Sequence, residues 1–418
     1  MIDKFNNLKV SIVIPVFNDF EYFEKLITSI VNQSYLPYEI IVIDSSHYDK
    51  IDNYIESTNF PFKLIYKRFY SKNYFSRLNP GKARNIGYNY STGDYLIFLD
   101  TKTIPQNNWL ELNINYLIEK KAELILGLTK FTYNNYFTKI TLYSTFGNEL
   151  IETLPGTIIS RNIFKKNKFI EEVRSGEDLE WKERMQQNYK NYIVNKIPLE
   201  YSSLPKNIYL LMKKYLIYSI NGAFINVQKN QKDLYLSILL IISLFIIPRW
   251  NYYLNNWEES FLYIPNITKY YLISIIFLFT LFIVFKNLFI DRLNLILLSL
   301  TIKLLFFIGI LYSVFRWNDL IANWAQNNIL YIPHVTKLFI FLVLFSSLIY
   351  RGIISPFKKK IKINELIPFQ WFFIGFIGLL IDLIKTPGLI LGSILSIMNF
   401  NFKKKKIIYE KRNNIYFV

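Results

Sequence analysis

The sequence predicts an α/β domain with a mainly parallel sheet, followed by an all-α region that crosses a membrane. In the N-terminal half, short β-branched runs that end in polar residues alternate with amphipathic stretches, which is typical of an α/β domain. In the C-terminal half, Leu, Ile and Phe crowd into long apolar runs flanked by lysines. The 418 residues suffice for two or three domains, and the absence of cysteine excludes disulfides and Cys-ligated metals.

The net charge of +18 fits three kinds of partner, namely nucleic acid, an anionic membrane surface and a phosphate-bearing ligand. Lysines stand beside apolar runs at 358–360 and 403–406, which favours a membrane surface. No nucleic-acid-binding module is recognisable, so we expect no nucleic-acid partner. Residues 1–9 are polar and do not resemble a signal peptide, so we expect the N-terminal domain to stay in the cytosol.

The first strands of the expected sheet are residues 10–15 and 39–44, with an amphipathic helix at 22–33 between them. Asn18 and Asp19 are expected to cap this helix. Asp44 ends the second strand, and we expect it at the edge where open α/β sheets bind ligands. The order strand, helix, strand predicts a parallel pair.

Residues 79–105 carry the most informative pattern, a basic turn that opens a helix. Gly81 permits close approach of the backbone to a ligand, and Lys82 and Arg84 supply positive charge. A helix that begins near Ala83 would direct its unpaired N–H groups at a phosphate. The pattern therefore predicts an anion site.

A buried strand at 95–99 follows, and Asp100 ends it. Beyond it we expect a helix at 109–120, a strand at 122–128 and a helix at 179–187. Asp100 would then lie at the same sheet edge as the end of the second strand.

Four segments together resemble the catalytic domain of family-2 glycosyltransferases, which have the GT-A fold. They are VSIVIPVFND at 10–19, IIVIDSS at 40–46, PGKARNIGYNYSTGDYLIFLD at 80–100 and SGEDLEWKERM at 175–185. The resemblance covers residues 10–197. It implies a Rossmann-like domain that binds a nucleotide-sugar donor and transfers the sugar with inversion.

The resemblance also assigns roles to single residues. Asp178 is the expected catalytic base, although a carboxylate at a helix start also fits a simple cap, and Asp100 is the first acid of the DXD motif. On the acceptor side we expect Glu177, Trp181 and Arg184, of which the last two could equally be structural. The expected donor-binding residues are Pro15, Val16, Phe17, Asn18, Asp44, Lys82, Arg84, Asp100 and Lys102.

The sequence departs from the family at the metal site. The DXD motif reads Asp100-Thr101-Lys102, with one carboxylate where Mg²⁺ or Mn²⁺ prefers several oxygen ligands. Three possibilities stay open: Asp100 alone holds the cation together with waters and the donor's phosphates, Lys102 supplies the positive charge instead, or the site is inactive. We expect weak metal dependence.

The C-terminal half is expected to be membrane-embedded. An Arg-Trp-Asn triplet followed by Leu-Tyr-Ile-Pro occurs at 249–265 and again at 316–333, so the four apolar runs form two tandem hairpins. The lysine distribution places these loops outside and the N-terminal domain in the cytosol. Lys303 lies in the third apolar run, at 293–315. Its ammonium group could pair with Asp382 or with a lipid phosphate, or it could extend to the membrane surface.

The expected organisation has four parts. Residues 1–205 form the cytosolic nucleotide-sugar-binding catalytic domain, and 206–232 an interfacial amphipathic linker. Residues 233–352 form the four transmembrane helices. Residues 353–418 form a basic segment, a re-entrant or interfacial hairpin around 385–388, and a basic tail.

We therefore expect an integral membrane protein, in a bacterial inner membrane and in contact with its lipids, that adds one sugar to a polyprenyl- or glycan-linked acceptor in cell-envelope glycan synthesis. The QxxRW signature of processive polysaccharide synthases does not follow Asp178, which favours single-sugar addition. Two alternatives stay open. One is a polyprenyl-phosphate monosaccharide synthase, whose phosphate acceptor needs little base catalysis, and the other is a non-catalytic nucleotide-sugar-binding membrane scaffold.

Overall fold

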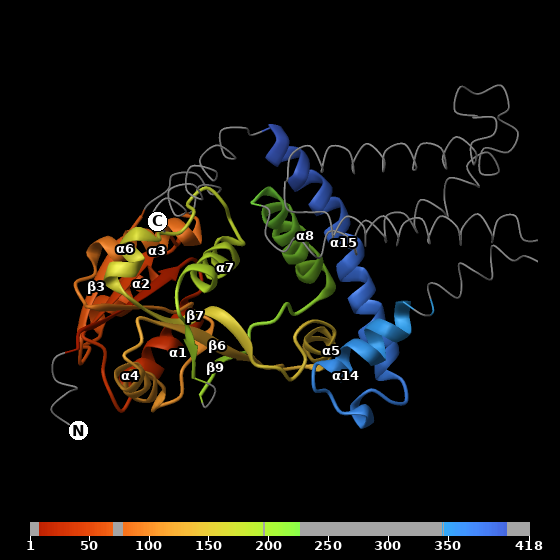
Figure 1. Cartoon of the computed structure of the whole chain (residues 1–418), viewed down its shortest axis with the longest axis horizontal. Coiled ribbons are helices and arrows are strands. Elements are labelled where there is room, and N and C mark those ends of the chain that lie inside the picture. The colour runs from red at the N-terminus through yellow and green to blue at the C-terminus, as the bar shows by residue number, and fades with distance from the viewer. Residues whose placement is uncertain (1–7, 70–77, 195–196, 226–344, 346, 399–418) are drawn as a thin grey trace, which may run out of the picture. The chain divides into compact units, whose positions relative to one another are not determined.

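The computed structural model describes residues 8–69, 78–194, 197–225, 345 and 347–398 (Figure 1). The chain divides into two compact units, one formed by Met1–Lys232 with Tyr350–Val418 and the other by Asp233–Ile349. The apolar runs at 234–247, 270–285 and 293–315, the repeated loops and Lys303 lie outside the described residues. Of the fourth run, at 338–350, the structure describes 345 and 347–350.

The N-terminal part of the sheet is a parallel block whose strands are connected by helices. The strands lie in the order β3-β2-β1-β4, and β1 and β2 contain no exposed residue because both faces of the sheet are covered. The strands are β1 (Val10–Val16), β2 (Glu39–Asp44), β3 (Lys63–Arg68) and β4 (Tyr95–Phe98). The helices are α1 (Phe20–Val31), α2 (Lys50–Ser57) and α3 (Pro80–Tyr90).

The sheet becomes mixed where β4 meets β7, because these two strands pair antiparallel, as do β6 and β7. The order continues β4-β7-β6-β9-β5, with β8 beside β6. The α/β class is as expected, but the sheet is parallel mainly in its N-terminal part. The remaining elements of the domain are β5 (Thr103–Ile104), α4 (Trp109–Lys120), β6 (Leu124–Phe131), α5 (Tyr136–Thr145), β7 (Ile151–Ser160), α6 (Arg161–Lys166), α7 (Glu177–Asn188), β8 (Tyr192–Ile193) and β9 (Leu199–Tyr201).

Two apolar cores lie on the two faces of the sheet, since successive strand residues point to opposite sides. Ile12 and Ile14 of β1 belong to the core that contains buried side chains of α1, α2 and α4. Val13 belongs to the second core, with side chains of α3, α6 and α7. Figure 1 shows the sheet between these two helix layers.

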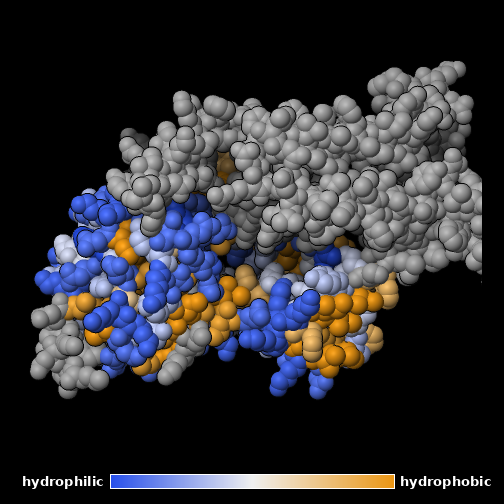
Figure 2. Space-filling view, viewed as in Figure 1, coloured by the Kyte–Doolittle hydropathy of each residue, from blue (hydrophilic) through white to orange (hydrophobic). Residues whose placement is uncertain are grey.

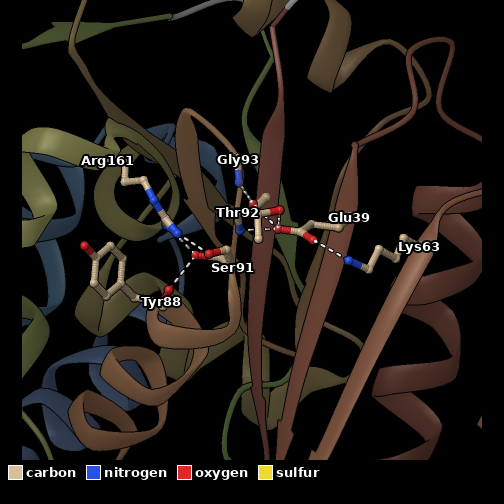
Figure 3. Close-up of polar contacts among 8 residues, drawn as sticks. Glu39, Lys63, Tyr88, Ser91, Thr92, Gly93 and Arg161 are labelled. Carbon is tan, nitrogen blue, oxygen red and sulfur yellow. Dashed lines mark hydrogen bonds and ion pairs between the residues drawn. The ribbon is translucent and has the colours of Figure 1, made fainter.

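The turn between α3 and β4 is held from both sides (Figure 3). Buried Glu39, at the start of β2, accepts hydrogen bonds from the Thr92 backbone N–H and hydroxyl and from the Ser11 hydroxyl. Arg161 donates to the hydroxyl and the carbonyl of Ser91. The strand that carries Asp100 to the opposite sheet edge is thus fixed where it begins.

The segments after the sheet pack on one another and on α5. They are α8 (Ile208–Phe224), η3 (Tyr350–Ile354), α14 (Ser355–Lys358), η4 (Ile363–Glu365) and α15 (Gln370–Met398). Ile140 of α5, Leu211 of α8 and Ile374 of α15 belong to one buried cluster. Asp382 of α15 pairs with Arg351 of η3, with 2.8 Å between Oδ2 and Nε.

Helix α15 runs without a break through Lys385 and Pro387, where the sequence predicts a hairpin. The expected hairpin is therefore not formed. Close packing on α8 accompanies this continuity, since a Cβ on Gly388 would lie 2.0 Å from the Ser219 hydroxyl oxygen. Within the described ranges, the stretch Gln370–Leu389 alone is long and apolar enough to cross a membrane by length and composition.

Candidate active site

Arg84 connects three elements at the carboxyl edge of the sheet. Its Nη2 donates to Oδ1 of Asp100, at the end of β4, over 2.8 Å, and its Nη1 donates to Oε1 of Glu177, at the start of α7, over 2.9 Å. The Arg84 residue is only 4% exposed, and its guanidinium lies over the Phe169 ring. This burial corrects its expected direct contact with the donor, because the side chain is enclosed by the two carboxylates that it positions.

The local sequence explains how α3 reaches α7. Pro80 stands in the first turn of α3, where its missing N–H leaves no helical hydrogen bond unmade. A Cβ on Gly81 would lie 2.3 Å from the Ile170 carbonyl oxygen and 3.2 Å from Cγ of Glu177. Only glycine fits this contact, and the close approach lets Arg84 meet Glu177.

Two adjacent carboxylates begin α7. Gly176 precedes them in the left-handed conformation, with φ of 88°, and the helix N-terminus stabilises their negative charge. Burial raises the pKa of Glu177 to about 7, the Asp178 charge adds to this, and Arg84 opposes it in part. Burial also raises the pKa of Asp178. Glu177 is 3% exposed while Asp178 is only partly buried, so Asp178 is the carboxylate that a substrate can reach.

The side chain of Asp100 is 38% exposed and faces the edge of the sheet. Lys102 lies 3.5 Å from Oδ1 of Asp19, and the Thr101 hydroxyl donates to the same carboxylate. Asp19 precedes α1 as expected, but its side chain does not cap that helix.

The residues present do not fit the divalent cation that the family resemblance implies. One oxygen of Asp100 already accepts from Arg84, and an ammonium group stands two residues on, where a second acid is needed. Across the described residues, no three His, Asp or Glu side chains come together as a possible ligand set.

The expected nucleobase residues lie at the ends of β1 and β2. Asn18 adopts φ of 55°, its Oδ1 accepts from the His47 N–H, and the Phe17 ring meets the His47 ring edge-on at 5.2 Å. Pro15 and Val16 are the last residues of β1, where Val16 is buried.

Two further donor-site residues differ in exposure. Asp44 is fully buried and accepts from the Ser46 N–H and the Tyr66 hydroxyl, so a nucleotide could reach its carboxylate only if Tyr66 moved. Lys82 is exposed in the first turn of α3.

The expected acceptor-side position of Trp181 and Arg184 is corrected by the structure. Trp181 is fully buried among core aromatic rings and donates to the Asn167 carbonyl. Arg184 binds Glu180 and the Lys168 carbonyl. Both side chains hold α7 against the segment at 167–168, since each donates to a carbonyl of that segment. Glu177 is likewise buried, so of the two carboxylates that begin α7 Asp178 is the one left for the acceptor side.

Residues of α8 and β9 near the site were not expected. Desolvation, followed by charges that include those of Asp178 and Asp100, raises the pKa of the Tyr218 phenol. The pKa of the Tyr201 phenol, in β9, is raised in the same way, by desolvation and then by the Asp100 charge. The sequence signal was the mixture of lysines and aromatic residues at 206–232, which predicted only an interfacial helix.

This fold and this cluster define an α/β domain with carboxylates gathered around one buried arginine at the carboxyl edge of its sheet. Residues 11–172 match the family model described as glycosyl transferase family 2, so this part of the chain is a family-2 glycosyltransferase domain. The α/β architecture is that expected for the GT-A class.

The chain is similar to an uncharacterized glycosyltransferase of Rickettsia bellii, with 32% identity over 41% of this chain and 25% of that protein. It is 27% identical to glycosyltransferase AglE of Haloferax volcanii over 42% of this chain and 60% of AglE. The chain thus spans from a quarter to three fifths of the length of these relatives. The crystal structure of S. aureus TarS residues 1–349 with UDP-GlcNAc aligns over 53% of this chain and 68% of that one, at 16% identity and a TM-score of 0.39.

Proposed function

We propose that the chain is an inverting glycosyltransferase that moves one sugar from a nucleoside-diphosphate sugar to a membrane-associated acceptor. The observation that carries the proposal is the cluster in which Arg84 holds Asp100 and Glu177 beside Asp178. The match of residues 11–172 to the family model supports a nucleotide-sugar donor.

Asp178 is the proposed base. As the acceptor hydroxyl oxygen attacks the anomeric carbon, Asp178 takes the hydroxyl proton, and the bond from the sugar to the diphosphate breaks with its electron pair on the diphosphate. Burial raises the pKa of Asp178, which makes it a stronger base than an exposed aspartate. Arg84 and Glu177 act by positioning, since both are buried.

The acceptor is proposed to be polyprenyl- or glycan-linked and to lie at a membrane. Large apolar side chains gather on the surface around α14 and the start of α15 (Figure 2). Phe357 is 60% exposed, Ile367 56% and Phe369 74%, and Lys358 and Lys360 lie beside them. Such a mixture of apolar and basic residues is typical of a membrane surface. Together with the apolar stretch Gln370–Leu389, it supports a membrane protein.

We place the catalytic domain on the cytosolic side of a bacterial inner membrane, in a step of cell-envelope glycan synthesis. Nucleotide sugars are cytosolic compounds, and the lysine distribution of the whole sequence favours this orientation.

The test is a transfer assay with the full chain in membranes, across UDP-, GDP- and dTDP-sugars. The proposal predicts turnover of one donor that stops in Asp100→Ala. Nucleotide binding without turnover of any donor would contradict it and favour the scaffold. Full activity in Asp178→Asn would instead favour a polyprenyl-phosphate acceptor, because a phosphate oxygen needs no base.

A further inference from the structure

We propose that helix α8 positions the catalytic base, with Asn221 as the residue that holds the segment before α7 in place and α15 as the helix that fixes α8. This inference rests on the proposed function, since it concerns the position of the proposed base Asp178. It assigns a role to a helix that lies outside the residues matched by the family model. Asn221 acts through the segment that it binds, so it is a positioning residue.

The end of α8 contacts the segment that leads directly into the carboxylates of α7. Oδ1 of Asn221 accepts a hydrogen bond from the Arg174 N–H over 3.3 Å. Ile225 packs on Gly176, where a Cβ would lie 3.1 Å from Cδ1 of Ile225. Gly176 adopts φ of 88° at the N-cap of α7. The end of α8 is therefore in contact with the residue at which the chain turns into α7.

The same segment also contacts the edge of the sheet. Nη1 of Arg174 donates to the carbonyl of Leu78, shortly before α3, over 3.3 Å. The Arg174 guanidinium lies over the ring of Phe17, directly after β1, at 5.8 Å from its centroid. The segment before α7 thus connects α8 with two elements that end at the proposed donor site.

A second set of residues on α8 packs closely against α15. A Cβ on Gly392 would lie 2.1 Å from the Ile220 carbonyl oxygen and 2.9 Å from Cβ of Ala223. A Cβ on Gly388 would lie 2.0 Å from the Ser219 hydroxyl oxygen. Glycines one helical turn apart let two helix backbones approach each other closely. Helix α15 therefore determines where α8 lies.

These two sets of contacts lie on opposite sides of α8. Since an α-helix has about 3.6 residues per turn, the residues at 219, 220 and 223 share one face. Asn221 and Ile225 are one turn apart and share another face, which is rotated by roughly half a turn from the first. Helix α8 thus lies between α15 and the segment before α7 (Figure 1). A displacement of α8 on α15 is consequently transmitted to the start of α7.

The proposed reaction depends on the position of that start. Asp178 is the second residue of α7, and a general base must stand within hydrogen-bond reach of the acceptor hydroxyl. A misplacement of about 1 Å can slow a reaction by roughly a hundredfold. Arg84 holds the neighbouring Glu177 from α3, and Asn221 holds the preceding segment from α8. We therefore expect the loss of the Asn221 hydrogen bond to lower kcat.

The test compares two variants of Asn221 in sugar transfer by the full chain in membranes, with the preferred donor. Asn221→Leu has a side chain of similar size but no acceptor oxygen, whereas Asn221→Asp keeps an oxygen at the same place. We expect kcat of Asn221→Leu to fall roughly ten- to a hundredfold, with KM for the donor near the wild-type value. Asn221→Asp should retain most of the wild-type kcat.

Asn207 provides a matched control at the other end of the same helix. Its Oδ1 accepts a hydrogen bond from the Leu210 N–H over 2.9 Å, so Asn207→Leu loses the same kind of bond. We expect this variant to melt at a lower temperature, because the helix loses its N-cap, but to transfer sugar at the wild-type rate. A purely structural role of Asn221 would likewise lower the melting temperature and leave kcat unchanged.

The contribution of α15 is tested by two Gly→Ala variants of that helix. Gly392→Ala places a methyl group against the backbone of α8, so we expect kcat to fall as it does in Asn221→Leu. Gly378→Ala is the control, because its Cβ would lie at an ordinary contact distance of 3.4 Å from Cβ of Arg351. Equal kcat values of these two variants would overturn the role assigned to α15.

The outcomes separate this inference from the proposed function. A wild-type kcat in Asn221→Leu, in a preparation that transfers sugar, would overturn the positioning role and leave the proposed glycosyl transfer standing. Absence of turnover by the wild type with every donor would contradict the proposed function, and with it the positioning of a base.

Discussion

Arg84 and Glu177 form a buried ion pair, with 2.9 Å between Nη1 and Oε1, although they stand 93 positions apart in the chain. The pair joins α3, which packs on one face of the sheet, to α7, which carries the proposed base. Since Arg84 also holds Asp100, the geometry of the site depends on this one guanidinium.

The first prediction concerns Arg84 itself. Arg84→Ala leaves the Glu177 carboxylate buried without its partner, which costs about 3–5 kcal/mol in free energy of unfolding. Urea unfolding of the full chain in detergent, followed by tryptophan fluorescence, measures this loss. The double variant Arg84→Ala/Glu177→Gln should regain part of it, because a neutral amide then replaces the buried Glu177 carboxylate. Equal unfolding curves for the wild type and Arg84→Ala would contradict the structural role of the pair.

The second prediction concerns the close approach of α3 to α7. Gly81→Ala places a Cβ 2.3 Å from the Ile170 carbonyl oxygen, so the helix must shift and the Arg84 contacts must lengthen. We expect sugar transfer to fall by at least about tenfold, since small displacements of positioning groups slow catalysis strongly. Gly222→Ala is the control, because its Cβ would meet nothing within 4 Å. Equal activity of the two variants would show that the contact is not required.

The third prediction is a pH dependence of stability that arises from Glu39. Burial alone would raise the pKa of this carboxyl, but hydrogen bonds from Thr92 and Ser11 and the charge of Lys63 outweigh it and hold the pKa below its ordinary value of 4.5. The stabilisation is therefore complete above about pH 4.5 and is lost as the pH falls through the lower, folded-state value.

Glu39→Gln removes this contribution. The difference in free energy of unfolding between the wild type and Glu39→Gln should thus be largest near neutral pH and shrink in acid. Glu56→Gln, at an exposed position on α2, should show no such pH-dependent difference. A wild-type advantage that stays constant down to pH 3 would contradict the assignment.

The sequence predicted the N-terminal domain well where one local pattern dominates. The bounds of β2 and α4 agree with those expected, because a continuous β-branched run and a clear helical period leave few alternatives. Asp44 and Asp100 also lie at one edge of the sheet as expected, because the strands that precede them both run parallel to β1.

Tertiary contacts explain what the sequence did not reveal. Helical spacing put Trp181 and Arg184 beside Asp178, but it could not show that their side of α7 faces the core. Pro387 predicted a break in the helix, but α15 continues through it and packs closely on α8 at Gly388.

The most direct test of the proposed mechanism compares two variants of α7 in a sugar-transfer assay with the preferred donor. Asp178→Asn keeps the size of the side chain but cannot accept the acceptor's proton, so we expect transfer to fall about 10²- to 10⁴-fold with nucleotide affinity unchanged. Glu183→Gln, at an exposed position on the same helix, should transfer as the wild type does. Transfer by Asp178→Asn at the wild-type rate would contradict base catalysis at this position.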